Sequence, residues 1–124
     1  MWCEVYFKVI VAGGRDFKNY NLLEKKLDVL LSNKVSDHTI VIVSGGANGA
    51  DKLGERYAKK RNYKVDKFPA DWDKYGKRAG YLRNEEMAKH GDVLVAFWDG
   101  VSRGTGHMIN IMKRLNKPVK IVRY

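Results

Sequence analysis

Apolar residues follow two alternating patterns along this chain. Continuous β-branched and apolar runs, typical of strands buried on both faces of a sheet, occupy Val5–Ala12, Thr39–Val43, Val65–Phe68, Asp92–Phe97 and Val119–Val122. Between these runs apolar residues recur at steps of three or four, as on one face of a helix, in Leu22–Leu31, Leu53–Ala58, Leu82–Ala88 and Met108–Leu115. Strands and helices are therefore predicted to alternate from end to end.

This alternation predicts the α/β class with a mostly parallel sheet covered by helices on both faces. We expect a single Rossmann-like three-layer domain over residues 1–124, with five strands in the order 3-2-1-4-5. Phe68–Lys77 and Asp99–Gly106 are expected to be long loops, and Pro118 ends the last helix. In such a sheet, ligands bind at the carboxyl ends of the strands where the strand order reverses, here between the first and fourth strands.

The composition limits the class of protein. A chain of 124 residues is long enough to bury a core without crosslinks, and its single cysteine, Cys3, cannot form an intrachain disulfide. The first eight residues lack the charged-then-apolar order of a signal peptide, and no apolar run approaches the roughly 20 residues that span a bilayer. These features predict a cytoplasmic protein without a membrane role.

The formal net charge of +10 favours polyanionic partners or phosphorylated ligands. The sign of the charge does not choose between these two classes. A third interpretation also remains open, in which many lysines simply solvate the outer faces of helices.

Three glycine-rich turns follow apolar runs, and the last two lead directly into helical patterns. Backbone N–H groups at a helix N-terminus lack intrahelical partners and lie at the positive end of the helix dipole, so they favour an anion. We therefore predict a phosphate-binding crevice with no catalytic residue assigned. Its expected ligand contacts are Gly13, Gly14, Arg15 and Asp16; Ser44, Gly45, Gly46, Asn48, Gly49 and Asp51; Arg83 and Asn84; and Ser102, Arg103, Gly104, Thr105 and Gly106.

Structural roles compete with these functional ones. The glycines suit ordinary strand-to-helix turns, Arg15 suits a salt bridge with Asp16 or another acid, and Asp51 suits either a ribose hydroxyl or a helix start. Trp72, Trp98 and Asp99 are candidate base or ribose contacts, although aromatic residues in loops also cover the edges of cores.

Other kinds of site find little support in the sequence. The three histidines, His38, His90 and His107, show no metal-ligand spacing with Cys3 or with carboxylates. His107 lies beside a glycine turn, where either an acid–base or a structural role fits. Neither Gly-x-Gly-x-x-Gly nor a glycine turn followed by Gly-Lys-Ser/Thr is present. We expect no metal and no cofactor.

Several motifs, in their order and spacing, resemble the SLOG superfamily, which includes the Smf/DNA-processing and lonely-guy groups, and most closely its small YspA-like members. They are Ala12–Phe17, Val43–Asp51, Pro69–Trp72, Leu82–Met87 and Asp99–Thr105. The resemblance implies a Rossmann-like domain that binds a nucleotide or nucleotide-derived ligand. Relatives include phosphoribohydrolases, sensors of ADP-ribose-like signals and single-strand DNA carriers, and they often pair through helices, which implies a homo-oligomer.

The resemblance also bears on enzymatic activity. The phosphoribohydrolase signature is Pro-Gly-Gly-x-Gly-Thr-x-x-Glu, and aligning Gly104-Thr105 with its Gly-Thr places Met108 at the glutamate. A thioether cannot act as an acid or base or stabilise a sugar cation as a carboxylate does, so we expect no hydrolase activity of that type.

The leading hypothesis is sensing or sequestration of a phosphorylated nucleotide, such as an ADP-ribose-like signal, without turnover. One alternative is an N-glycosidic hydrolase that uses Asp16, Asp51, Asp99 or His107 in place of the missing glutamate. A second is a single-stranded nucleic-acid-binding protein with basic residues on phosphates.

Overall fold

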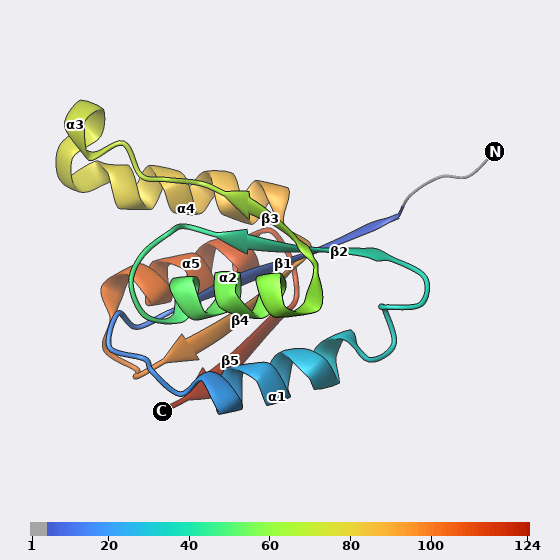
Figure 1. Cartoon of the computed structure of the whole chain (residues 1–124). Coiled ribbons are helices and arrows are strands. Elements are labelled where there is room, and N and C mark those ends of the chain that lie inside the picture. Colours follow the sequence, from blue (N-terminus) through green and yellow to red (C-terminus); the bar gives the residue numbers. More distant parts are fainter. Residues whose placement is uncertain (1–4) are drawn as a thin grey trace.

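The computed structural model describes residues 5–124, so Cys3 and its expected lack of a disulfide lie outside the described residues. Within them strands and helices alternate (Figure 1). The strands are β1 (Tyr6–Gly13), β2 (Thr39–Ser44), β3 (Lys64–Lys67), β4 (Val93–Trp98) and β5 (Val119–Arg123). The helices are α1 (Tyr20–Leu31), α2 (Ala50–Arg61), α3 (Trp72–Tyr75), the 3-10 helix η1 (Gly76–Arg78), α4 (Ala79–His90) and α5 (Arg103–Arg114).

The five strands form one sheet in the order β3-β2-β1-β4-β5, with every neighbouring pair parallel, which confirms the predicted fold class and strand order. Val9 of β1 lies beside Ile42 of β2 on one side and Val93 of β4 on the other. The order reverses between β1 and β4, so the carboxyl ends of these two strands mark the expected binding crevice. The strand arrows point to the left in Figure 1, where α2 and α5 begin.

Successive residues of the central strands point to opposite faces of the sheet, and each face has its own core. Val9 and Val11 of β1 belong to the cluster that includes Leu23 of α1 and Tyr57 of α2. Ile10, between them, belongs to the cluster formed with α4 and α5. A strand covered on both faces needs apolar residues at every position, which explains why the sequence shows continuous runs.

The prediction of a loop over Phe68–Lys77 was wrong in part, because this segment contains α3 and the start of η1. The Asp71 side chain accepts a hydrogen bond from the Lys74 N–H at 3.1 Å and so caps α3, and Gly76, with φ +59°, ends it. No residue of α3 is buried, so hydrophobic periodicity could not reveal this single turn. The predicted loop Asp99–Gly106 is also shorter than expected, because α5 already begins at Arg103.

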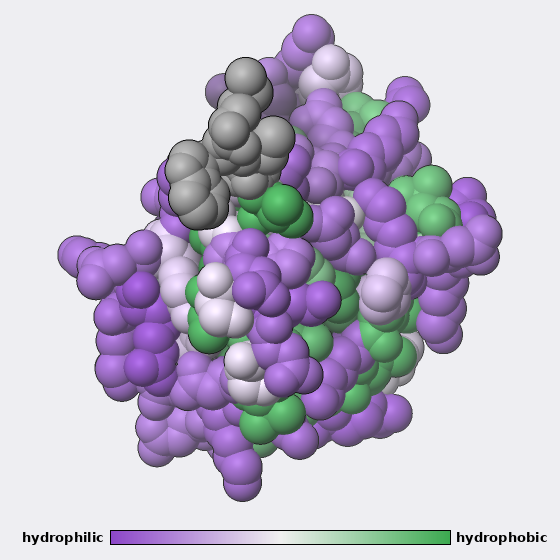
Figure 2. All heavy atoms as spheres, turned by 90° about the vertical axis from the view of Figure 1, so that its right-hand side faces the viewer, coloured by the Kyte–Doolittle hydropathy of each residue, from purple (hydrophilic) through white to green (hydrophobic). Residues whose placement is uncertain are grey.

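The surface facing the right-hand side of Figure 1 is mainly hydrophilic, with hydrophobic residues in small separate groups (Figure 2). Across residues 5–124, none of the helices combines the length and apolar character needed to cross a membrane.

Candidate functional site

A crevice with two compartments lies at the carboxyl ends of the strands. The wide compartment, of about 470 Å³, is bordered by the turn after β2 and by Lys67, Pro69, Ala70 and Trp72. The narrow compartment, of about 280 Å³, is bordered by the end of β1, by α4 and by the start of α5. Arg15, Ala47 and Arg83 line both compartments, so the two lie side by side. The crevice therefore lies at the predicted reversal of strand order.

The third glycine turn presents open backbone donors to the narrow compartment. The Gly106 N–H donates to the Ser102 carbonyl at 3.1 Å, while the Ser102 side chain caps none of the first amides of α5. Among the described residues the Arg103, Gly104 and Thr105 N–H groups donate to no acceptor. Ser102, Gly104 and Thr105 line the compartment, so these amides and the helix dipole are available to an anion.

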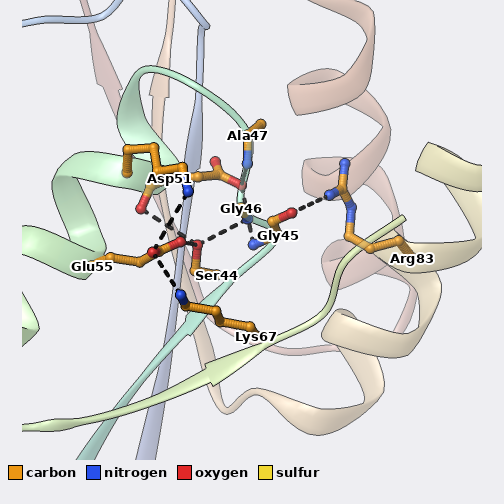
Figure 3. Close-up of polar contacts among 9 residues, drawn as sticks. Ser44, Gly45, Gly46, Ala47, Asp51, Glu55, Lys67 and Arg83 are labelled. Atoms are coloured by element: carbon orange, nitrogen blue, oxygen red, sulfur yellow. Dashed lines mark hydrogen bonds and ion pairs between the residues drawn. The ribbon is translucent and has the colours of Figure 1, made fainter. Parts of the chain in front are cut away.

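The second glycine turn differs, because its own carboxylate occupies the amides (Figure 3). Asp51 Oδ2 accepts from the Gly45 N–H at 3.1 Å and from the Ala47 N–H at 3.4 Å. The Gly46 N–H donates to Ser44 Oγ at 3.0 Å, and that hydroxyl donates to Glu55 at 2.6 Å. This turn is thus largely satisfied internally.

The first glycine turn holds the second in place and supplies a free cation. The Gly14 carbonyl accepts from the Ala50 N–H at 3.3 Å, which joins the first turn to the start of α2. Asp16 accepts a 2.6 Å hydrogen bond from the Tyr124 hydroxyl. Arg15, for which a salt bridge with Asp16 was the alternative, forms no ion pair with any residue in 5–124. Its guanidinium is left for the crevice.

Arg83 and Asn84 connect α4 to both glycine turns. Arg83 donates to the Gly45 carbonyl at 2.8 Å and to the Asn84 side chain at 3.1 Å. Asn84 Nδ2 donates to the Gly104 carbonyl at 3.1 Å and lies 3.3 Å from His107 Nδ1. This chain of hydrogen bonds fixes the position of the Arg83 guanidinium between the two turns.

Burial shifts the pKa values of two charged residues in the crevice. Burial raises the pKa of Asp51 to about 6, although Arg83 and the backbone hydrogen bonds act in the opposite direction. Burial also lowers the pKa of Arg83, Asp51 counteracts this effect, and the like charge of Arg15 adds to it. Two guanidinium groups therefore share a site with one carboxylate, and an added anion would offset the excess positive charge.

The structure brings together 12 of the predicted ligand contacts and places the rest elsewhere. Those that line the crevice are Gly13, Arg15, Gly45, Gly46, Asn48, Asp51, Trp72, Arg83, Asn84, Ser102, Gly104 and Thr105. Gly14, Asp16, Ser44, Gly49, Trp98, Asp99, Arg103 and Gly106 do not line it.

The residues outside the crevice have structural partners. Trp98, Arg103 and Gly106 border a separate cavity with Tyr81 and His107, and Trp98 Nε1 donates to the Ser102 carbonyl at 3.0 Å. Asp99 accepts from the Val101 and Ser102 N–H groups, both at 2.8 Å, and so holds the third turn.

Sequence reasoning missed several residues that line the crevice. Lys67 ends β3 and Lys52 follows Asp51, and both contribute positive charge to the wide compartment. Lys67 Nζ lies 3.4 Å from Glu55 Oε1 and forms an ion pair with it. The position of Lys67 at the carboxyl end of a parallel strand was a usable signal, since all such ends meet at one edge. Met87 and Met108 line the narrow compartment, and both are almost fully buried.

Three or more metal-ligating side chains do not cluster anywhere in residues 5–124. The charged residues that line the wide compartment are instead all lysines and arginines: four of them line it, and no acid does. The donor set of the crevice therefore suits an anion and not a cation.

Comparisons with solved structures agree with this fold. Among solved structures, TM1055, a structural-genomics target, is similar with a TM-score of 0.65 and 21% identity, over 91% of this chain and 72% of that one. DNA processing protein A from Helicobacter pylori, described for its single-stranded DNA binding mode, has a TM-score of 0.63 and 20% identity, over 95% of this chain and 66% of that one. These two likenesses concern the fold alone.

Sequence comparisons identify the family. The Gene 61 protein of Mycobacterium phage D29 is 36% identical over 118 residues, which cover 90% of this chain and 93% of that protein. The family model described as YspA, cpYpsA-related SLOG matches residues 7–75, a range that contains the first two glycine turns. The chain belongs to the YspA, cpYpsA-related SLOG family.

Proposed function

We propose that this protein binds a nucleotide or nucleotide-derived phosphorylated ligand, such as an ADP-ribose-like signal, and senses or sequesters it without turnover. The observation that carries the proposal is the narrow compartment, where the open amides of Gly104 and Thr105 and the guanidinium groups of Arg15 and Arg83 line one space. A phosphate is the anion that this arrangement fits best. Membership of the SLOG family fits nucleotide-related binding or processing.

The lack of turnover is inferred from the same compartment. Met108, only 1% exposed, stands where the phosphoribohydrolase signature has its glutamate. Of the groups considered as substitutes, Asp16, Asp99 and His107 do not line the crevice, and Asp51 alone does. Among the residues that line the crevice, no second carboxylate or histidine is available to protonate the departing nucleobase. The pair of groups needed for general acid–base hydrolysis is therefore incomplete.

Isothermal titration calorimetry with ADP-ribose, cyclic nucleotides and the 5′-nucleoside mono-, di- and triphosphates tests the proposal. We expect saturable binding at one site, and a loss of about 10- to 100-fold in affinity for Arg83→Met, because a hydrogen bond to a charged group contributes about 1.5–3 kcal/mol. Arg103→Met is the matched control: Arg103 is on the first turn of α5 but borders the other cavity. An equal loss in both variants, or no binding by any member of the panel, would refute the proposal.

Turnover is measured separately. The tightest ligand is incubated with stoichiometric protein and followed by mass spectrometry, and we expect its mass to be unchanged. If free base or ribose phosphate is released by the wild type and not by Asp51→Asn, the hydrolase alternative is supported and binding without turnover is rejected.

Single-stranded nucleic-acid binding is a second candidate, favoured by one surface feature. Trp72 and Tyr75 on α3 are exposed, at 51% and 44%, and Lys74 and Lys77 lie beside them. Trp72 also lines the wide compartment. Exposed aromatic rings next to cations suit stacked bases and phosphates, and DNA processing protein A, of similar fold, is described for binding single-stranded DNA.

Fluorescence anisotropy with a labelled oligothymidine distinguishes this candidate from a nucleotide pocket. Binding through phosphates weakens steeply as salt increases, and Trp72→Ala is expected to weaken it several-fold. Tyr81→Ala, which changes an exposed aromatic residue bordering the other cavity, is the control. Absent oligonucleotide binding at low salt would exclude the candidate.

A further inference from the structure

Asp51 is an acidic residue in a crevice whose other charged lining residues are all cations. The wide compartment is lined by Arg15, Lys52, Lys67 and Arg83, and Asp51 is the one acid among the residues lining either compartment. A carboxylate at this place repels a phosphate. The phosphate proposed above is thereby directed to the amides of α5, and Asp51 is left facing a different part of the ligand.

Only half of the Asp51 carboxylate is used by the protein. The hydrogen bonds from Gly45 and Ala47 both end on Oδ2. Oδ1 has no hydrogen-bond partner among the described residues, although the side chain is only 6% exposed and lines the narrow compartment. An ionised carboxylate can only accept hydrogen bonds, so Oδ1 is free to accept one from a ligand.

The position of Asp51 indicates which donor this is. Asp51 lines the narrow compartment and accepts from the N–H of Ala47, which lines both compartments, so the carboxylate lies next to a residue that the two compartments share. On one side are the amides of α5, and on the other is the exposed indole of Trp72. A nucleotide carries phosphate, sugar and base in that order, and its sugar hydroxyls are the neutral donors between the two ends.

We propose that Asp51 Oδ1 accepts a hydrogen bond from a ribose hydroxyl and makes the crevice selective for ribonucleotides over their deoxy analogues. The inference rests on the proposed function, because it assumes a nucleotide with its 5′-phosphate at the start of α5 and its base in the wide compartment. It adds the class of sugar and the residue that recognises it.

Asp51→Asn separates this role from a purely structural one. The asparagine oxygen can keep accepting from the Gly45 and Ala47 N–H groups, which turns the amide NH₂ toward the position of Oδ1. An acceptor then becomes a donor, while the shape of the turn is retained. Glu55→Gln is the matched control, because Glu55 is on the same helix and in the same network but does not line the crevice.

The experiment is calorimetry at about pH 8, where Asp51 with its pKa of about 6 is ionised. The probes are the four 5′-ribonucleoside monophosphates, their 2′-deoxy counterparts, ADP-ribose and, for the tightest monophosphate, the 3′-deoxy analogue. In the wild type we expect at least one deoxy analogue to bind about tenfold or more weakly than its parent. Asp51→Asn is expected to reduce this ratio several-fold, because a hydrogen bond between the hydroxyl and a neutral amide is weaker than one to a carboxylate, and Glu55→Gln is expected to leave the ratio unchanged.

Thermal unfolding of each variant confirms that the proteins titrated are folded. Equal binding of ribose and both deoxy forms by the wild type would overturn the inference and leave nucleotide binding intact. Discrimination that is as strong in Asp51→Asn as in the wild type would also overturn it. If no nucleotide in the panel binds, the inference fails together with the proposed function.

Discussion

The pKa of Asp51 makes a quantitative prediction about stability that requires no ligand. Burial raises this pKa from 3.8 to about 6 in the folded protein. Between these values the folded state binds more protons than the unfolded state, so the free energy of unfolding falls as pH rises. The contribution is fully present below the unfolded pKa and is lost as pH rises through the folded pKa. A raised pKa of this size corresponds to about 3 kcal/mol.

Asp51→Asn removes this titration and leaves the other groups in place. The assay is urea unfolding of both proteins at several pH values from about 4 to 8, with extrapolation to zero denaturant. We expect the free energy of unfolding of the variant, relative to the wild type, to rise by about 2 kcal/mol between about pH 4 and pH 7, because part of the full effect is already lost at pH 4, just above the unfolded pKa. Only the pH dependence of this difference in unfolding free energy tests the pKa. The size of the difference at any single pH also includes the effect of the altered hydrogen bonds in the turn.

Asp99→Asn gives the opposite sign and is therefore the control. Hydrogen bonds from the Ser102 and Val101 N–H groups lower the pKa of Asp99, so its contribution is present above the unfolded pKa and is lost as pH falls through the folded value. A difference between wild type and Asp51→Asn that stays flat from about pH 4 to pH 7 would refute the reasoning, whatever Asp99→Asn shows.

Three further substitutions test the glycine turns and the packing of α2. Gly49→Ala is expected to lower the free energy of unfolding by about 1–3 kcal/mol, because its φ is +84° and a Cβ would meet the backbone of the first turn; an unchanged urea midpoint would contradict this. Gly104→Ala has open space around its Cβ, so we expect unchanged or slightly higher stability but weaker nucleotide binding by calorimetry, and full affinity would argue against phosphate at α5. Tyr57→Phe removes a 2.6 Å hydrogen bond to Asp28 on α1 and is expected to cost about 1 kcal/mol, measured by thermal unfolding; no loss would show that the bond is not stabilising.

The sheet could be predicted from the sequence because its central strands are buried on both faces. Such strands need an apolar residue at every position, as in Val9–Val11 and Ile40–Val43, and the connecting helices make the neighbouring strands parallel. The reversal of strand order, and with it the location of the crevice, then follows from topology. α3 escaped prediction because a helix of four exposed residues has no buried face to produce a period.

Trp98 and Asp99 show the limit of reasoning from position in the chain. Trp98 ends β4 and Asp99 follows it directly, so the sequence places both at the correct edge of the sheet, but it does not show on which side of the third turn their side chains lie. Trp98 borders the cavity that Tyr81 also lines, and the Asp99 carboxylate accepts hydrogen bonds from the Val101 and Ser102 N–H groups. Which way a loop side chain points depends on such local hydrogen bonds, which have no periodic signature.

The second and third glycine turns look alike in the sequence, yet only the second is followed by a helix with an acidic residue in its first turn. α2 carries Asp51 in its first turn, and this carboxylate takes the amides of Gly45 and Ala47. α5 has no acid in its first turn, and its open amides therefore need an anion from outside. A glycine turn before a helix is thus a better candidate phosphate site when the first amides of the helix are not already taken by a side chain. By this criterion α5 is the better candidate, because Asp99 accepts from Val101 and Ser102, which precede the helix, and not from the amides of its first turn.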